Sequence, residues 1–202
     1  MRLRSCLLAV VLIIGSGDRG SATDPRDPDW PCAQLRVPEL SVAAIWVGPD
    51  LGDATTAWKD DPAVADLVDR LAARRTPLDE AQTLISDFLN GGDRVARGKL
   101  LFAGLFDRID AQRTSVMSGL DRITRKQRAA AEAIRANTLA LRALQDTPEQ
   151  DQARIEQLGN QLAWQTRIFE DRRQVIRFAC EVPVKIDQRL FALGRLIQQS
   201  ME

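Results

Sequence analysis

Apolar residues recur at intervals of three and four along the C-terminal half of the chain, as in a helix that buries one side. One narrow stripe comprises Val116, Leu120, Ile123, Ala130, Ile134, Leu141 and Leu144. A second stripe comprises Ile155, Leu158, Leu162, Phe169, Ile176 and Ala179, with Gln165 and Arg172 at two positions of the series. A narrow stripe needs only one partner helix. The pattern therefore predicts two helical arms that pair lengthwise, and it sets Trp164 against the alanines 129–131.

A turn separates the two stripes. Thr147-Pro148-Glu149-Gln150 has the composition of a helix start, with Thr147 as N-cap, Pro148 as first helical residue and Gln150 completing a capping box. The turn lies nearly midway between Asp93 and the end of the chain. We therefore predict a long antiparallel coiled-coil hairpin over residues 93–202, with its turn at 146–148 and arms of up to about 75 Å.

Both arms become apolar on several sides near residues 100–109 and 184–197, so these parts must be buried on several sides. Two short helices are predicted to cover them. Asp61-Pro62 starts a helix to about Arg74, and Thr76-Pro77 starts another, which ends at Asn90-Gly91-Gly92 because glycine tolerates a left-handed closing residue. We predict a small four-helix bundle at the base of the hairpin, with Pro183 kinking the second arm.

The remaining mature chain, residues 23–60, is rich in proline and predicted to be irregular, apart from a short helix or strap near residues 38–47. Trp30, Trp46 and Trp58 are expected to anchor it to the helices. The fold class is thus all-α, with residues 61–92 forming two short helices and residues 93–202 the hairpin.

The N-terminus has the features of a secretory signal. Arg2 and Arg4 precede the apolar run 7–14, and small residues follow up to Ala22. We expect residues 1–22 to be a cleaved signal peptide and the protein to be periplasmic or secreted. The apolar run is too short to be a stable transmembrane anchor, although an uncleaved anchor is the alternative. Arg4 disfavours lipid attachment at Cys6.

Export would leave two cysteines, Cys32 and Cys180. An even count in an exported chain favours a disulfide, and two buried free thiols are the alternative. The bond would fasten the irregular segment near the point where the bundle gives way to the coiled coil.

Composition excludes several kinds of chemistry. The 202 residues include no histidine and no tyrosine, so a serine or cysteine mechanism with a histidine base is impossible. Asp50, Asp53, Asp60 and Asp61 lack the spacing of a calcium loop. We therefore predict no metal and no cofactor. The basic run at 122–128 has no flanking aromatic residues for base stacking, and 28 basic residues balance 28 acidic ones. We predict no nucleic-acid partner.

A pair of carboxylates for glycoside hydrolysis is a further alternative. The acidic residues available are Glu39, Asp107, Asp110, Glu181 and Asp187. A helical hairpin offers no obvious groove for a sugar chain. Asp107, Asp110 and Asp187 are better explained as surface partners of Arg108, Arg113 and Arg189, where each ion pair contributes little.

Two short motifs near the mature N-terminus carry a family resemblance. Residues 27–32 read Asp-Pro-Asp-Trp-Pro-Cys, and residues 37–41 read Val-Pro-Glu-Leu-Ser. This stretch resembles uncharacterised exported proteins of proteobacteria. The resemblance covers about twenty residues, implies a bacterial periplasmic setting and carries no known activity.

The sequence favours a non-enzymatic interaction or chaperone-like protein whose hairpin docks on an envelope partner. Residues at the tip are the candidate binding residues, namely Leu141, Leu144, Ile155 and Leu158. The alternatives are a homo-oligomeric structural coiled coil that buries flank residues such as Trp164 and Phe169, and, ranked last, a carboxylate-dependent cell-wall hydrolase.

Overall fold

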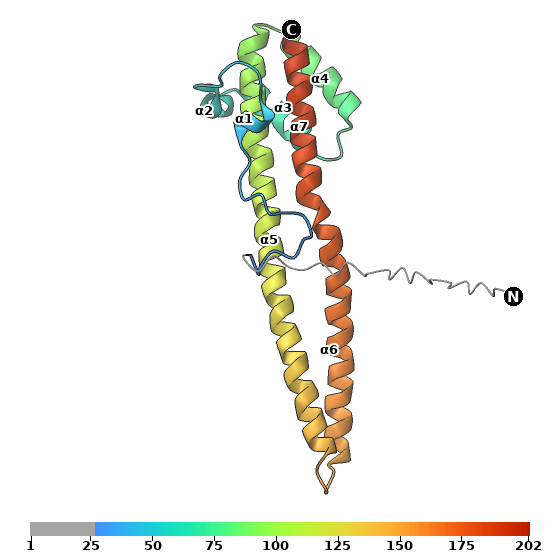
Figure 1. Ribbon diagram of the computed structural model, residues 1–202. Coiled ribbons are helices and arrows are strands. Elements are labelled where there is room, and N and C mark those ends of the chain that lie inside the picture. Colours follow the sequence, from blue (N-terminus) through green and yellow to red (C-terminus); the bar gives the residue numbers. More distant parts are fainter. Residues whose placement is uncertain (1–26) are drawn as a thin grey trace, which may run out of the picture.

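The computed structural model describes residues 27–202, in which the regular elements are helices and no strand occurs (Figure 1). The elements are α1 (Val42–Ile45), α2 (Ala54–Ala57), the short 3₁₀ helix η1 (Trp58–Asp60), α3 (Pro62–Ala72), α4 (Leu78–Asn90), α5 (Arg94–Gln145), α6 (Gln152–Ala179) and α7 (Glu181–Met201). The all-α class is confirmed. The predicted signal peptide, residues 1–22, lies outside the described residues.

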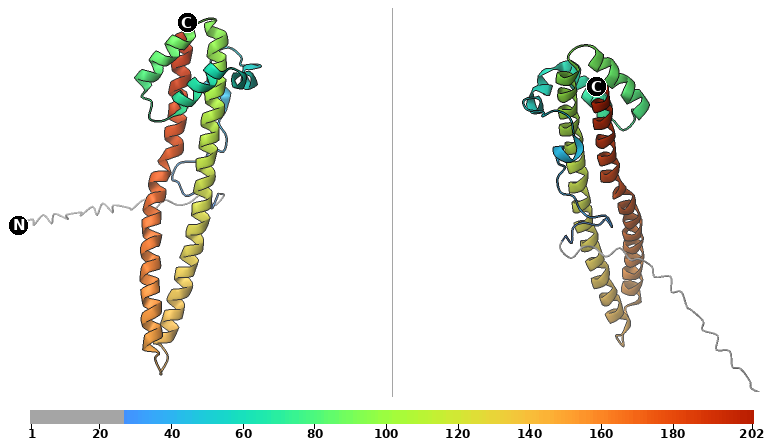
Figure 2. Two further views of the ribbon diagram at one scale, coloured as in Figure 1. Left: turned by 180° about the vertical axis from the view of Figure 1, so that it is seen from behind. Right: turned by 45° about the horizontal axis from the view of Figure 1, so that its top comes forward.

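The long hairpin is the dominant feature of the molecule (Figures 1 and 2). Helix α5 runs its whole length, and α6 and α7 return beside it in the opposite direction. Asp93 caps α5 as its position predicts, because its carboxylate accepts hydrogen bonds from the backbone N–H groups of Val95 and Ala96.

The turn lies where it was predicted, but the predicted capping box was wrong. The Thr147 hydroxyl donates to the carbonyl of Leu144, and the Gln150 side chain donates to the carbonyl of Gln145. Both groups therefore satisfy the end of α5 instead of the start of α6. The N-cap of α6 is Asp151, whose carboxylate accepts from the N–H of Arg154.

The two short helices, α3 and α4, lie where they were predicted, but the N-cap of α4 and the reason for its end need correction. Asp61 caps α3 through the N–H groups of Ala63 and Val64. The cap of α4 is Pro77, because the buried Thr76 donates its hydroxyl backwards to the carbonyl of Arg70. Helix α4 ends at Gly91 as expected, but with φ of −79°, so left-handed closure was the wrong reason.

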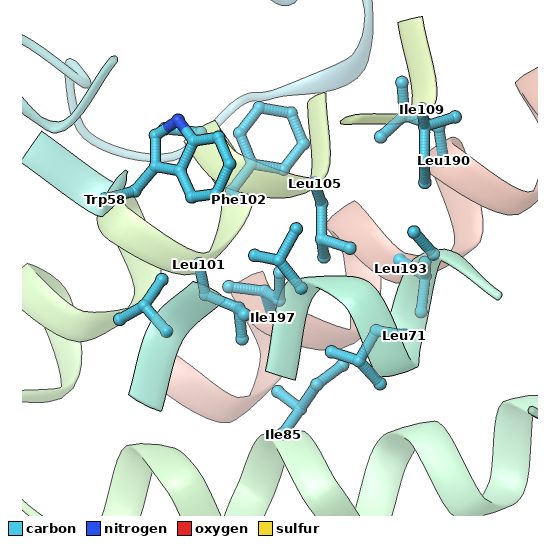
Figure 3. Packing of buried hydrophobic residues seen from close by; sticks show 14 of the residues in the cluster. Trp58, Leu71, Ile85, Leu101, Phe102, Leu105, Ile109, Leu190, Leu193 and Ile197 are labelled. Carbon is cyan, nitrogen blue, oxygen red and sulfur yellow. The ribbon is translucent and has the colours of Figure 1, made fainter. Parts of the chain in front are cut away.

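The main core lies at the base, between α3, α4, α7 and the first part of α5. Figure 3 shows Leu71, Ile85, Leu101, Phe102, Leu105, Ile109, Leu190, Leu193 and Ile197 converging there, with Trp58 of η1 at one side. Trp46 stacks on Phe102 with 4.3 Å between ring centroids. The predicted four-helix bundle is therefore confirmed.

Residues 27–45, here called the strap, run along α5 beside the base (Figure 1). The Cys32–Cys180 disulfide joins the strap to the end of α6, with 5.5 Å between the Cα atoms. Trp30 is buried beside this bond with Met117, Leu120 and Ile176. The predicted staple and the anchoring by tryptophans are confirmed, although α2 and η1 were not predicted in the segment called irregular.

The second arm bends at Cys180, where a single non-helical turn residue separates α6 from α7. Pro183 has no N–H to offer the carbonyl of Ala179, so the helical hydrogen-bond series is interrupted there. Cys180 itself keeps right-handed backbone angles, φ −62° and ψ −23°. The predicted kink is therefore confirmed as a bend.

Two glycines allow a matched test of packing at the base. A Cβ on Gly104 would lie 2.6 Å from Cγ2 of Val68, whereas a Cβ on Gly159 of α6 meets nothing within 4 Å. Gly104→Ala is expected to lower the free energy of unfolding by about 1–2 kcal/mol. Gly159→Ala is expected to raise it by about 0.5–1 kcal/mol. Urea unfolding of both variants measures this, and stabilisation by Gly104→Ala would contradict the close packing of α3 on α5.

Candidate functional site

The outer part of the hairpin contributes nothing to the core. This part, here called the rod, comprises residues 128–175 with the turn between the arms. No side chain in the rod is buried, whereas buried residues follow one another closely in the base and continue outwards along α5 to Gln127. The rod is therefore a surface element supported by the base, and it is the candidate functional region.

Polar contacts in the seam between the arms set their register. The Gln127 side chain donates to the carbonyl of Phe169 over 2.8 Å. The Asn137 amide donates to Oε1 of Gln165 over 2.9 Å. Polar pairs of this kind select one alignment of two helices. Sequence analysis identified Gln165 only as a gap in the apolar stripe, and nothing in the stripe identified Asn137 as its partner.

The four predicted tip residues occupy the last seam layers before the turn. Leu141 and Leu144 come from α5, and Ile155 and Leu158 come from α6. Each is half-buried. A two-helix seam has no third helix to cover it, so part of each apolar side chain stays in contact with water.

Trp164 lies on a flank of the rod and 65% of its side-chain surface is exposed. It lines a notch of about 130 Å³ together with Ala130, Ala133, Ile134 and Ile168. Trp164 therefore lies at nearly the predicted height along the hairpin, beside the alanines of α5. The predicted burial of the indole against the partner helix was wrong, because Trp164 precedes the seam position 165 by one residue and points sideways. Phe169 is half-buried in the seam, as its place in the apolar stripe predicts, and not on the flank where the oligomer alternative put it.

The acidic residues considered for hydrolysis are mostly neutralised by separate cations. Asp107 pairs with Lys59, Glu181 pairs with Lys185, and Asp187 pairs with Arg113. Burial raises the pKa of Asp187, and the negative charge of Asp110 raises it further, while Arg113 lowers it. Asp110 and Asp187 thus lie near each other, with the buried guanidinium of Arg113 beside them, and Glu39 is exposed on the strap.

Arg113 is the most deeply buried charged residue in the described chain, with 2% of its surface exposed. Its guanidinium donates to Asp187 over 2.8 Å and to the carbonyls of Val37 and Pro38. The predicted surface pair of Arg113 with Asp110 was therefore wrong, because Arg113 is buried and pairs with Asp187. The predicted pair of Asp107 with Arg108 was also wrong, since Arg108 pairs with Asp69. Arg189 was also misassigned, because it donates to the carbonyls of Leu71 and Thr76, and burial lowers its pKa.

The basic run at 122–128 is only partly neutralised by acidic partners. Arg125 and Arg128 pair with Asp29 of the strap, while Arg122 and Lys126 take part in no ion pair of residues 27–202. Within the same range no group of three acidic or cysteine side chains is placed to hold a metal ion. None of the described helices is long and apolar enough to cross a membrane.

Comparison of the chain with protein-family models, with curated proteins and with solved structures found no match. Inference of function therefore depends on the surfaces of this chain alone. Among these, the rod is distinguished by its length, its half-exposed seam and its exposed aromatic residue.

Proposed function

We propose that the protein is a non-enzymatic interaction protein of the bacterial envelope, which presents its hairpin to a partner protein. The observation that carries this proposal is the absence of any buried side chain in residues 128–175. Ordering a residue costs about 1–2 kcal/mol of backbone entropy, and this stretch returns little burial in exchange. A long projecting element that does not build the core is well suited to reach a partner.

The setting is supported by the Cys32–Cys180 disulfide, since such bonds persist in oxidising compartments outside the cytoplasm. The signal-like N-terminus supports the same setting. Together they favour a periplasmic or secreted protein.

The seam at the tip is the proposed contact region. Leu141, Leu144, Ile155 and Leu158 are half-buried, so an amphipathic helix laid along the seam would cover the apolar surface that remains exposed. A partner helix with apolar residues at intervals of three and four matches the spacing of these seam residues. In this role no covalent bond is made or broken, and the protein acts by binding.

Site-specific photocrosslinking tests this proposal. A photoreactive amino acid is placed at Leu144 in the tip, and at the exposed Gln82 of α4 as a control on the base. In intact cells we expect one discrete crosslinked product from position 144 and none from position 82. Equal crosslinking at both positions, or none at either, would contradict docking through the tip.

Shortening the hairpin gives an independent expected outcome. Removing residues 131–144 and 155–168 takes two heptads from each arm and leaves the turn and the base in place. Because the removed residues include none that is buried, the thermal midpoint of the base is expected to change by only about 2–4 °C. The shortened chain lacks position 144, so binding is measured by pull-down of the partner that crosslinking identified, and this capture is expected to be lost. A collapse of the base on shortening would show that the rod is structural.

A further inference from the structure

One flank of the hairpin carries a row of exposed alanines on α5 and several large apolar residues on α6. On α5 an exposed row of alanines is spaced by four and three, namely Ala129, Ala133, Ala136, Ala140 and Ala143. On α6 the corresponding row contains four apolar residues, Trp164, Ile168, Val175 and Phe178, with Asp171 among them and the exposed Arg154, Gln157 and Gln161 nearer the turn. Three of these four are large and 58–65% exposed. The five alanines and the four apolar residues of α6 are here called the alanine–tryptophan flank.

Both rows lie on the same side of the hairpin. Each precedes a seam position by one residue, and in two antiparallel helices that offset points to one common side. The notch shared by Ala133 and Trp164 confirms the placement. The other flank differs in chemistry, since it carries Arg128, Arg135 and Arg142 on α5.

At the base, a helix already packs on this flank. Arg108, Gln112 and Ser115 precede Ala129, Ala133 and Ala136 by three heptads and so point to the same side of α5. These three residues lie against Asp69, Ala72 and Ala73 at the end of α3. Beyond Ser115 nothing covers the flank in residues 27–202. The flank thus accepts a helix at the base and is bare along the rod.

Charges of opposite sign lie at the two ends of the alanine row. Arg122 and Lys126 continue the row towards the base, and both are exposed. Asp146, Glu149 and Asp151 lie at the tip, also exposed. None of these five side chains takes part in an ion pair within the described residues.

We propose that a second copy of this chain covers the alanine–tryptophan flank, antiparallel to the first, with the two-fold axis passing beside Ala136. Residues equally distant from Ala136 then face each other, so that Ala129 meets Ala143 and Lys126 meets Asp146. The basic end of each rod lies against the acidic tip of the other. Alanine against alanine lets the two α5 helices approach closely, and the two Trp164 indoles meet near the axis.

The antiparallel arrangement also avoids a clash. In a parallel pair, the α3–α4 layers of the two copies would occupy the same space, because both cover this flank at the base. In the antiparallel pair, the partner's tip reaches the level of Arg122, which is seven residues or roughly 10 Å short of Ser115.

The surface that the two copies would bury is large enough for a stable dimer. Overlap from residue 122 to residue 150 gives a length of about 42 Å at 1.5 Å per residue, and two helices side by side are about 20 Å wide. Each copy would bury on the order of 800 Å², which matches a standard protein interface. The dimer is independent of the envelope partner proposed above, because the flank and the seam at the tip are different surfaces.

Sedimentation velocity of the exported, oxidised chain between about 1 and 100 μM tests the proposal. Dimers with an interface of standard size commonly stay associated at these protein concentrations. We expect a dimer. Ala136→Glu sets two carboxylates beside the two-fold axis and should weaken dimerisation by at least about 100-fold, as expected for burying unpaired charge. Ala163→Glu is the matched control, an exposed alanine that follows seam residue Leu162 and lies on the opposite flank. It should leave the dimer intact.

Charge reversal tests the register. Lys126→Glu is expected to weaken the dimer about tenfold, and adding Asp146→Lys should restore it, as charge pairs across an interface set register. Far-UV circular dichroism checks that each variant stays helical. A chain that is monomeric at every concentration, a dimer equally tolerant of glutamate at 136 and 163, or a failure of the double reversal to restore affinity would each overturn the proposal.

Discussion

Replacing both Cys32 and Cys180 with alanine is expected to lower the free energy of unfolding by about 4–5 kcal/mol. The bond joins residues 148 positions apart, and closing so long a loop removes much of the entropy of the unfolded chain. In the folded state the same bond holds the strap against α5 and α6, with Trp30 buried beside it. Denaturant unfolding of the oxidised protein and of the double variant measures the difference.

Reduction of the wild-type protein with a thiol provides the matched control, because it breaks the same bond without changing any side-chain volume. Both treatments should give the same loss within about 1 kcal/mol. A loss below about 1 kcal/mol in both cases would show that the strap is held by its other contacts, among them the pairing of Arg36 with Asp121.

Replacing Arg113 with methionine is expected to cost about 3–5 kcal/mol. The guanidinium is buried and its removal leaves Asp187 and the carbonyls of Val37 and Pro38 without their donor. Arg108→Met is the control, since Arg108 lies on the same helix and pairs with Asp69 at the surface. That change should cost no more than about 1 kcal/mol. Equal effects of the two changes in denaturant unfolding would contradict a special role for Arg113.

The loss from Arg113→Met should depend on pH. Without Arg113, the influences that remain on Asp187, burial and Asp110, both raise its pKa. A carboxyl whose pKa is higher in the folded state takes up a proton more readily there, so the folded state is disfavoured as pH rises through that pKa. The loss in the variant, relative to wild type, should therefore be smaller at about pH 4 than at about pH 7.

Periodicity was enough to predict the architecture, because a stripe spaced by three and four specifies a helix face and its width specifies how many partners the helix has. The narrow stripe around Ile134 and Leu162 thus predicted the paired arms, and the broad apolar stretch around Leu105 predicted the bundle. The disulfide was predicted by counting, since removal of the predicted signal peptide would leave only Cys32 and Cys180.

Side-chain contacts were harder to predict because several groups compete for the same partner. Thr147 and Asp151 are both good N-caps, and only the observed turn decides that Asp151 caps α6 while Thr147 closes α5. Arg113 looked like a surface charge because carbonyl acceptors from the strap, 75 and 76 residues away, cannot be read from local spacing. The alanine row was visible in the sequence, but its exposure depends on where α3 ends.

Distance measurement between two spin labels tests most directly whether the arms pair within one chain. Labels at Arg135 and Thr166, both exposed on the rod, are introduced in a Cys6→Ser background and diluted with unlabelled chain. Adjacent helix axes lie about 8–10 Å apart, so a single narrow distribution near about 20 Å is expected once the label arms are included. A distance near about 45 Å, the separation along one continuous helix, or loss of the signal on dilution would contradict the hairpin.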